Sequence, residues 1–236
     1  MEIFFGQTIL TDHLFLSEDE SHHCVNVLRK NTGDIIQVID GKGHLLEGPL
    51  EITGKKKPVK VWIEKSGFFP ENLFRSQFNL AIAPTKNTDR MEWMVEKTVE
   101  LGIQSITFLT CEHSERTTLR VDRLEKIAIA ALKQSKQYWL PNLTMPVSFK
   151  SYIDQFPKNE QGFIAHCYDG NKREFGQIKY KENTHVLIGP EGDFSELEIE
   201  WALNKGIQAV SLGASRLRTE TAAMYSCSVF RLSATK

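Results

Sequence analysis

The chain has 236 residues, a formal net charge of -1 at pH 7 and a hydrophobic content of 41%. This length corresponds to one large domain or two modest ones, and the apolar content is enough for a packed core. Proteins that bind nucleic acid mainly through charge are usually basic overall, so any RNA-binding surface here must gather its positive charge locally.

The four cysteines are scattered and form no C-x-x-C pair, which is typical of free thiols in a reducing compartment. The run His22-His23-Cys24 lacks the ligand spacing of a zinc site, so we expect no metal. No basic segment followed by an apolar one opens the chain, and no apolar stretch approaches the ~20 residues that span a bilayer. We therefore expect a cytoplasmic protein without a membrane segment.

The first part of the chain, residues 1–69, is predicted to be a small β-barrel. Ser17 and Glu20 have the spacing of a capping box, which predicts a short helix that ends near Thr32-Gly33. Asp-Gly between the apolar runs 35–39 and 45–52 predicts a hairpin, and an alternating strand follows at 59–63. We place the linker to the second part at 67–72, where Pro70 and polar residues interrupt the pattern.

The second part, residues 73–236, alternates strands with helices, which predicts a parallel sheet. A strand at 78–83 is followed by a helix that Asp89 can cap and that Gly102 ends, then by a strand at 103–109. Glu96 and Glu100 share one face of that helix, and a further helix that includes Gln134 is predicted to end at Pro141. The apolar run 163–165 predicts another strand, which His166 follows.

Two strand–loop–helix units end the chain. The strand 186–188 stops at the loop 189–192, and Ser195 with Glu198 forms a capping box for the helix that Gly206 ends. A strand at 207–212 leads into a second loop and then a C-terminal helix. Ligands of open α/β sheets bind at the carboxyl ends of strands, so both loops are expected to form the active site.

These loops do not carry the glycine patterns of common cofactor and hydrolase sites. Neither G-x-G-x-x-G nor G-x-x-x-x-G-K-[ST] is present, which argues against a dinucleotide or a nucleoside triphosphate. Ser215 lacks the flanking glycines of a nucleophile elbow, which argues against a serine hydrolase.

The segments IGPEGDFS and SLGASRLRTETAA, at this spacing, closely resemble the 16S ribosomal RNA uridine-N3 methyltransferases (RsmE) of the SPOUT class. The resemblance extends to the segments around Lys86, Glu115 and Gln134 and to the N-terminal part. It implies an α/β domain with a trefoil knot at 73–236 and a PUA-like RNA-binding barrel at 1–69. It also implies S-adenosylmethionine as methyl donor, N3 of a uridine of 16S ribosomal RNA in the 30S subunit as acceptor, and a homodimer.

The resemblance also implies roles for particular residues. We expect Arg218 to stabilise negative charge on the uracil carbonyls as N3 loses its proton, and Glu220 to orient Arg218 or to take that proton. A structural ion pair between these two side chains is the alternative. The expected cofactor-binding residues are Leu187, Gly189, Pro190, Glu191, Gly192, Leu212, Gly213, Leu217, Arg218, Thr219 and Ala222. The expected RNA-binding residues are Arg29, Lys86, Arg116, Lys136 and Arg216.

The chain departs from the family pattern at two places. Lys136 follows Gln-Ser where many members have an arginine, and Asp193 replaces a glycine that is common after G-P-E-G. Three other functions stay open on the sequence alone. They are a SPOUT enzyme that acts on another RNA or another atom, a non-catalytic RNA-binding module, and a small-molecule α/β enzyme.

Overall fold

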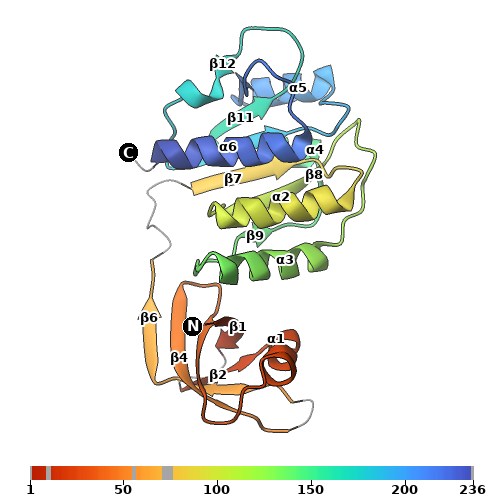
Figure 1. Cartoon of the computed structure of the whole chain (residues 1–236). Helices are drawn as coiled ribbons and strands as arrows, with labels where there is room; N and C mark the ends of the chain where they lie inside the picture. The colour runs from red at the N-terminus through yellow and green to blue at the C-terminus, as the bar shows by residue number, and fades with distance from the viewer. Residues whose placement is uncertain (1, 9–11, 55–56, 71–76, 235–236) are drawn as a thin grey trace. The chain divides into compact units, whose positions relative to one another are not determined.

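The computed structural model describes residues 2–8, 12–54, 57–70 and 77–234. The chain forms two compact units (Figure 1). Unit 1 contains Met1–Leu73 and Ile129–Leu140, and unit 2 contains Phe74–Ala128 and Pro141–Lys236. Residues 129–140 thus belong to the first unit, although more than fifty residues of sequence separate them from the rest of it. The predicted division of the chain at a single linker does not include this return of the chain to unit 1.

Unit 1 is built on a closed ring of five strands. The order β3-β1-β2-β5-β4 returns to its start because β3 also pairs with β4, and β6 adds to β4. The strands are β1 (Ile3–Thr8), β2 (His13–Leu16), β3 (Ile35–Ile39), β4 (His44–Glu51), β5 (Lys60–Trp62) and β6 (Lys65–Phe68). Apolar side chains that alternate along them fill the interior, among them Phe4, Leu14, Val38 and Val61. The predicted barrel and its Asp-Gly hairpin are therefore confirmed.

The first helix is shorter than predicted. Helix α1 (Glu18–His22) passes into a π-helical turn, His23–Val27, and ends before Thr32-Gly33. Ser17 caps α1 by accepting a hydrogen bond from the backbone N–H of Glu20 (3.3 Å). The Glu20 carboxylate, which a capping box would direct to the N-terminus of the helix, instead accepts a hydrogen bond from the backbone N–H of Phe5 and forms an ion pair with Lys133. The predicted linker is also partly wrong, since Gly67 and Phe68 belong to β6. Residues 71–76 lie outside the described part of the chain.

Unit 2 is an eight-stranded sheet with the order β10-β8-β7-β13-β11-β14-β12, and β9 also pairs with β8. The described pairings of this sheet are parallel, as predicted. The strands are β7 (Gln77–Ile82), β8 (Ser105–Thr110), β9 (Asn142–Leu143), β10 (Val147–Ser148), β11 (Gln161–Ala165), β12 (Arg173–Glu174), β13 (Asn183–Ile188) and β14 (Gln208–Ser211).

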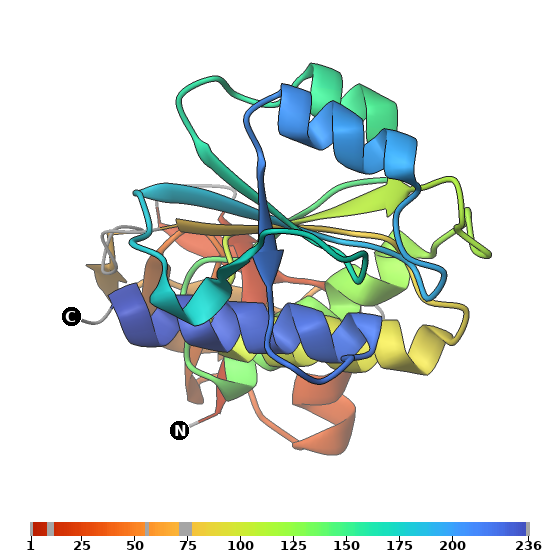
Figure 2. The same cartoon turned by 90° about the horizontal axis from the view of Figure 1, so that it is seen from above.

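Helices cover both faces of this sheet (Figure 2). Helices α4 (Phe149–Asp154) and α5 (Glu196–Asn204) pack together on one face, and α2 (Thr88–Glu100) packs with α6 (Thr219–Ala234) on the other. Helix α3 (Val121–Gln134) contributes residues to both units, and it ends at Gln134 and not at Pro141 as predicted. None of the helices in the described residues is long and apolar enough to cross a membrane.

Local signals predicted most helix ends in unit 2. The capping box of α5 is complete, because Ser195 Oγ accepts from the N–H of Glu198 and the Glu198 carboxylate accepts from the N–H of Ser195. The prediction for α2 is wrong by two residues. Asn87 caps this helix, and its side chain accepts a hydrogen bond from the N–H of Asp89 (2.8 Å).

Candidate functional site

Three parallel strands end side by side in the middle of the unit 2 sheet. The register places Ile188 of β13 beside Ala165 of β11, and Ala165 beside Val210 of β14. Strands β13 and β11 end at these residues and β14 ends one residue further on, at Ser211, so three loops begin at the same edge. Because β11 lies between the other two, the loop that starts at His166 joins the two loops that the sequence predicted.

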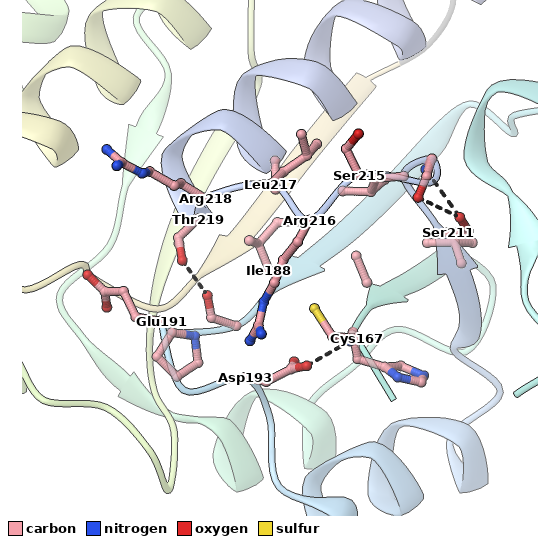
Figure 3. A pocket seen from close by; sticks show the side chains of 18 of the residues that line it. Cys167, Ile188, Glu191, Asp193, Ser211, Ser215, Arg216, Leu217, Arg218 and Thr219 are labelled. Carbon is pink, nitrogen blue, oxygen red and sulfur yellow. Dashed lines mark hydrogen bonds between the residues drawn. The ribbon is translucent and has the colours of Figure 1, made fainter. Parts of the chain in front are cut away.

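A cavity of about 710 Å³ opens at this edge (Figure 3). Its walls come from the ends of β11, β13 and β14, from the loops that follow them, and from the first turn of α6. It is therefore formed where ligands of open α/β sheets bind. The lining includes Arg90, His166, Cys167, Lys172, Asp193 and Arg216 beside the residues predicted from the two loops.

Most of the predicted cofactor-binding residues line this cavity. They are Gly189, Pro190, Glu191, Leu212, Gly213, Leu217, Arg218, Thr219 and Ala222. Leu187 and Gly192 are not among the lining residues. Leu187 lies in the core cluster below the cavity with its side chain fully buried. Gly192 packs against His113, where a Cβ would come within 3.0 Å of the Cβ of that histidine. A role for these two residues in ligand contact stays a prediction.

Polar bonds tie the loop 189–192 to its neighbours. Thr219 Oγ1 donates to the backbone oxygen of Gly189 (3.1 Å), which links this loop to the start of α6. The Glu191 carboxylate accepts from the backbone N–H of Lys86 (3.0 Å). Arg116 donates to the backbone oxygen of Lys86 (2.8 Å), and the Lys86 ammonium lies 2.9 Å from the Glu115 carboxylate. Lys86 and Arg116, predicted to bind RNA, therefore also hold loops together at the rim.

The two arginines of the second loop point in different directions. Figure 3 shows Arg216 directed into the cavity between Ile188 and Cys167, whereas Arg218 points away from these residues. Both side chains are exposed. Both arginines line the cavity, and the Arg216 side chain reaches further toward Ile188 and Cys167 than the Arg218 side chain does.

The buried carboxylate of Glu220 has a different partner from the one predicted. It lies in the first turn of α6, and its Oε1 is 3.6 Å from Nε of Arg90 in α2. Oε2 of the same carboxylate is buried and makes no hydrogen bond. The expected interaction of Glu220 with Arg218 is thus replaced by an ion pair with Arg90. The sequence analysis missed Arg90, and the only signal for it was its place in the first turn of the helix after β7.

Glu96 and Glu100, which share a face of α2, form ion pairs with a lysine between them. Lys97 lies between them and pairs with Glu96 (2.6 Å) and with Glu100 (2.9 Å). Among the described residues no cluster of three or more histidines, cysteines or carboxylates could hold a metal ion.

Two other predicted RNA-binding residues, Arg29 and Lys136, are exposed in unit 1 and adopt positive φ angles of 53° and 55°.

His166 contributes an imidazole to the cavity wall. Burial lowers its pKa below the ordinary value of 6.5, and the nearby Lys172 lowers it further while Asp193 opposes the shift. The folded protein therefore resists protonation of His166. When the pH falls through 6.5, the unfolded chain takes up this proton before the folded protein does. The contribution of His166 to the free energy of unfolding is therefore fully present above pH 6.5 and is lost as the pH falls below it.

We therefore expect the substitution His166→Asn to flatten the pH dependence of stability. Between about pH 7.5 and about pH 5.5 the free energy of unfolding of the variant should fall less than that of the wild type, because the variant no longer carries this group. Denaturant titrations at a series of pH values measure it. Equal slopes for the two proteins would contradict the assignment of a lowered pKa to His166.

The fold and the cavity define the class of the protein: a parallel α/β domain that binds its ligand at the carboxyl ends of its strands, joined to a small closed barrel. A family model described as RNA methyltransferase domain matches residues 72–231, and one described as RNA methyltransferase PUA domain matches residues 16–61. The chain belongs to the RNA methyltransferase domain family. The knot of the SPOUT class stays a prediction from the resemblance.

Known proteins of similar sequence and structure agree with this family. A probable rRNA-methyltransferase from Porphyromonas gingivalis is 34% identical with a TM-score of 0.90, over 100% of this chain and 99% of the other. The ribosomal RNA small subunit methyltransferase E of Neisseria gonorrhoeae, solved bound to S-adenosyl methionine, is 26% identical with a TM-score of 0.85, over 98% and 97%. The enzyme of the same name from Buchnera aphidicola is 26% identical over 91% of this chain and 86% of its own length.

Proposed function

We propose that the protein transfers a methyl group from S-adenosylmethionine to N3 of a uridine in the 16S ribosomal RNA of the small subunit. The observation that carries this proposal is the cavity at the ends of β11, β13 and β14, lined by the residues of the two loops that resemble the family. Relatives named ribosomal RNA small subunit methyltransferase E, one of them solved with S-adenosyl methionine, support it.

The residues of the cavity fit this cofactor. S-adenosylmethionine has no phosphates, so the absence of a dinucleotide glycine pattern from the two loops is no obstacle. Gly213 has a φ of +112° and open space beside its Cα, which lets loop backbone come close to an adenine ring. Glu191 and Asp193 add carboxylates to the wall, which suits a ligand with a positive charge.

When bound, S-adenosylmethionine supplies an electrophilic methyl group on a positively charged sulfur. The protein's task is then to place N3 of the uracil in line with that group and to remove the proton that N3 carries. Arg218 would stabilise the negative charge that develops on the uracil carbonyls, and its exposed side chain at the lining of the cavity supports this role. Glu220 forms an ion pair with Arg90 and would act by holding this part of the wall in position.

RNA contact is proposed for both units. The barrel of unit 1, with Arg29 and Lys136 exposed, would hold the RNA, and Lys86, Arg116 and Arg216 would bind phosphates near the cavity. We also propose that the protein acts as a homodimer in the cytoplasm, where small ribosomal subunits are found. Tyr225 and Leu232 on α6, 37% and 73% exposed, offer apolar surface for a second copy.

A methyl-transfer assay tests the proposed function. The protein is incubated with labelled S-adenosylmethionine and 30S subunits from cells that lack this activity, and the RNA is digested to nucleosides. N3-methyluridine is the expected product. Cofactor binding without this product would move the substrate to another RNA or another atom, and no cofactor binding would overturn the proposal.

The bond between Thr219 and Gly189 gives a separate prediction for cofactor affinity. The substitution Thr219→Val keeps the side-chain shape but leaves the buried carbonyl of Gly189 without its donor, so the affinity for S-adenosylmethionine is expected to fall roughly tenfold. Thr219→Ser keeps the hydroxyl and is expected to bind nearly as the wild type does. Calorimetric titration measures both, and equal affinities of the two variants would contradict the prediction.

A further inference from the structure

Asp193 occupies a backbone conformation that its residue type seldom adopts. Its φ angle is +66°, in the left-handed region, where a residue with a Cβ is less stable than glycine by roughly 1–2 kcal/mol. Aspartate tolerates this region better than most residues because its short side chain can bond to nearby backbone. A strained residue in a cavity wall suggests that its side chain has a local function.

The carboxylate of Asp193 joins two loops. One oxygen accepts from the backbone N–H of the next residue, Phe194 (2.8 Å), and the other accepts from the backbone N–H of Cys167 (2.7 Å), as Figure 3 shows for the second bond. The backbone oxygen of Asp193 lies 3.1 Å from Nδ1 of His113, in the loop after β8. Asp193 therefore connects the loop after β13 with the loops after β11 and β8.

The loop after β11 forms one wall of the cavity, and the carboxylate of Asp193 supports it. His166 and Cys167 line the cavity immediately beyond the last residue of β11. A bond from a backbone N–H to a carboxylate is charge-assisted and is about twice as strong as a neutral one. The carboxylate also acts on the Cys167 thiol, because burial and then the charge of Asp193 raise its pKa.

We propose that Asp193 is a positioning residue of the cofactor cavity: its carboxylate holds the loop after β11 against the loop after β13 and so keeps the two walls at the separation that the ligand needs. The choice of S-adenosylmethionine as that ligand rests on the proposed function. The holding of the loop does not, because it follows from the two hydrogen bonds and can be measured without any ligand.

Two substitutions separate the backbone from the carboxylate. Asp193→Gly relieves the strain at positive φ but removes both hydrogen bonds. Asp193→Asn tolerates positive φ, yet it has only one oxygen, so its amide N–H₂ must face one of the two backbone N–H groups. Asp169→Asn is the matched control, since it removes an exposed carboxylate from the same loop, two residues beyond Cys167.

The first measurement is the rate at which iodoacetamide alkylates Cys167, read by mass spectrometry on its peptide. Cys167 is exposed, whereas Cys24, Cys111 and Cys227 are buried, so the reagent reports on this loop. The rates are compared at a pH where the thiol is fully ionised, because loss of the Asp193 charge by itself increases the thiolate fraction at lower pH. Both Asp193 variants are then expected to react several-fold faster than the wild type, because the loop opens. Asp169→Asn is expected to react at the wild-type rate.

The second measurement is the dissociation constant of S-adenosylmethionine by calorimetry. Asp193→Asn is expected to bind it about tenfold more weakly, as the loss of one charge-assisted hydrogen bond predicts, and Asp193→Gly, which loses both bonds, at least as weakly. Unchanged alkylation rates would overturn the proposal, and so would faster alkylation with unchanged affinity. If the wild type binds no S-adenosylmethionine at all, the proposed function fails, and the alkylation rates still decide whether Asp193 holds the loop.

Discussion

Replacing Arg218 with alanine is expected to lower the rate of methyl transfer about 100-fold or more while the dissociation constant of S-adenosylmethionine changes little. The loss of a single fixed donor that stabilises developing negative charge typically has this effect. Arg218 lines the cavity, but its side chain is exposed and points away from Ile188 and Cys167, so we expect most contacts that hold the cofactor to remain in the variant.

The fold should survive the change at Arg218. Its backbone oxygen accepts from the N–H of Ala222 (2.8 Å) at the start of α6, and alanine keeps that bond. Single-turnover rates with 30S subunits and calorimetric titration of the cofactor give the two quantities separately. Equal losses of rate and of cofactor affinity would contradict the catalytic role and would assign Arg218 to the cofactor site.

Arg216→Ala is the informative comparison because it removes the neighbouring arginine of the same loop. Its side chain points into the cavity, so the expected loss is in the binding of the cofactor or the RNA, with a smaller effect on the rate of the bound complex. Arg218→Lys keeps the charge but not the planar fork and is expected to fall between alanine and the wild type.

The elements that the sequence predicted well are those that neighbouring residues determine. The capping box of α5 needs only Ser195 and Glu198, and the β3–β4 hairpin needs only the Asp-Gly turn between two apolar runs. The end of β13 directly before Gly189 follows from local chemistry in the same way, whereas β14 ends at Ser211, one residue before the predicted end of that strand. The two loops could therefore be assigned to one site before the structure was known.

The features that could not be predicted depend on which strands and helices become neighbours. Strand β11 precedes β13 and β14 in the chain but lies between them in the sheet, and this alone brings Cys167 to Asp193. The same holds for α2 and α6, whose packing pairs Arg90 with Glu220 across more than one hundred residues of sequence. The resemblance to the family instead suggested Arg218 as the partner of Glu220.

The ion pair of Arg90 with Glu220 leads to the prediction with the largest expected effect on stability. In Arg90→Ala the carboxylate stays buried, with a side-chain exposure of 9%, and loses its positive partner. Removing one partner of a buried pair costs about 3 kcal/mol, and less where the partner is partly exposed, as Arg90 is. We therefore expect a loss of about 2 kcal/mol and a fall in melting temperature of roughly 4–8 °C.

A second ion pair of unit 2 provides the control. Arg123 pairs with Glu92 at 2.6 Å, but the Arg123 side chain is 59% exposed, so Arg123→Ala is expected to cost less than about 1 kcal/mol. In the double variant Arg90→Ala with Glu220→Ala, the unpaired carboxylate is gone. It should therefore be more stable than the sum of the two single losses predicts, a difference that a double-mutant cycle measures by thermal unfolding.

The same variants decide what Glu220 does in catalysis. If it positions the cavity wall through Arg90, then Glu220→Ala and Arg90→Ala should lower stability and methyl transfer together, since both changes release the same contact between α2 and α6. If Glu220 accepts the proton of N3 instead, Glu220→Ala should abolish methyl transfer, whereas Arg90→Ala should leave a substantial rate. The carboxylate is buried and forms its ion pair with Arg90 and not with Arg218, which favours the positioning role.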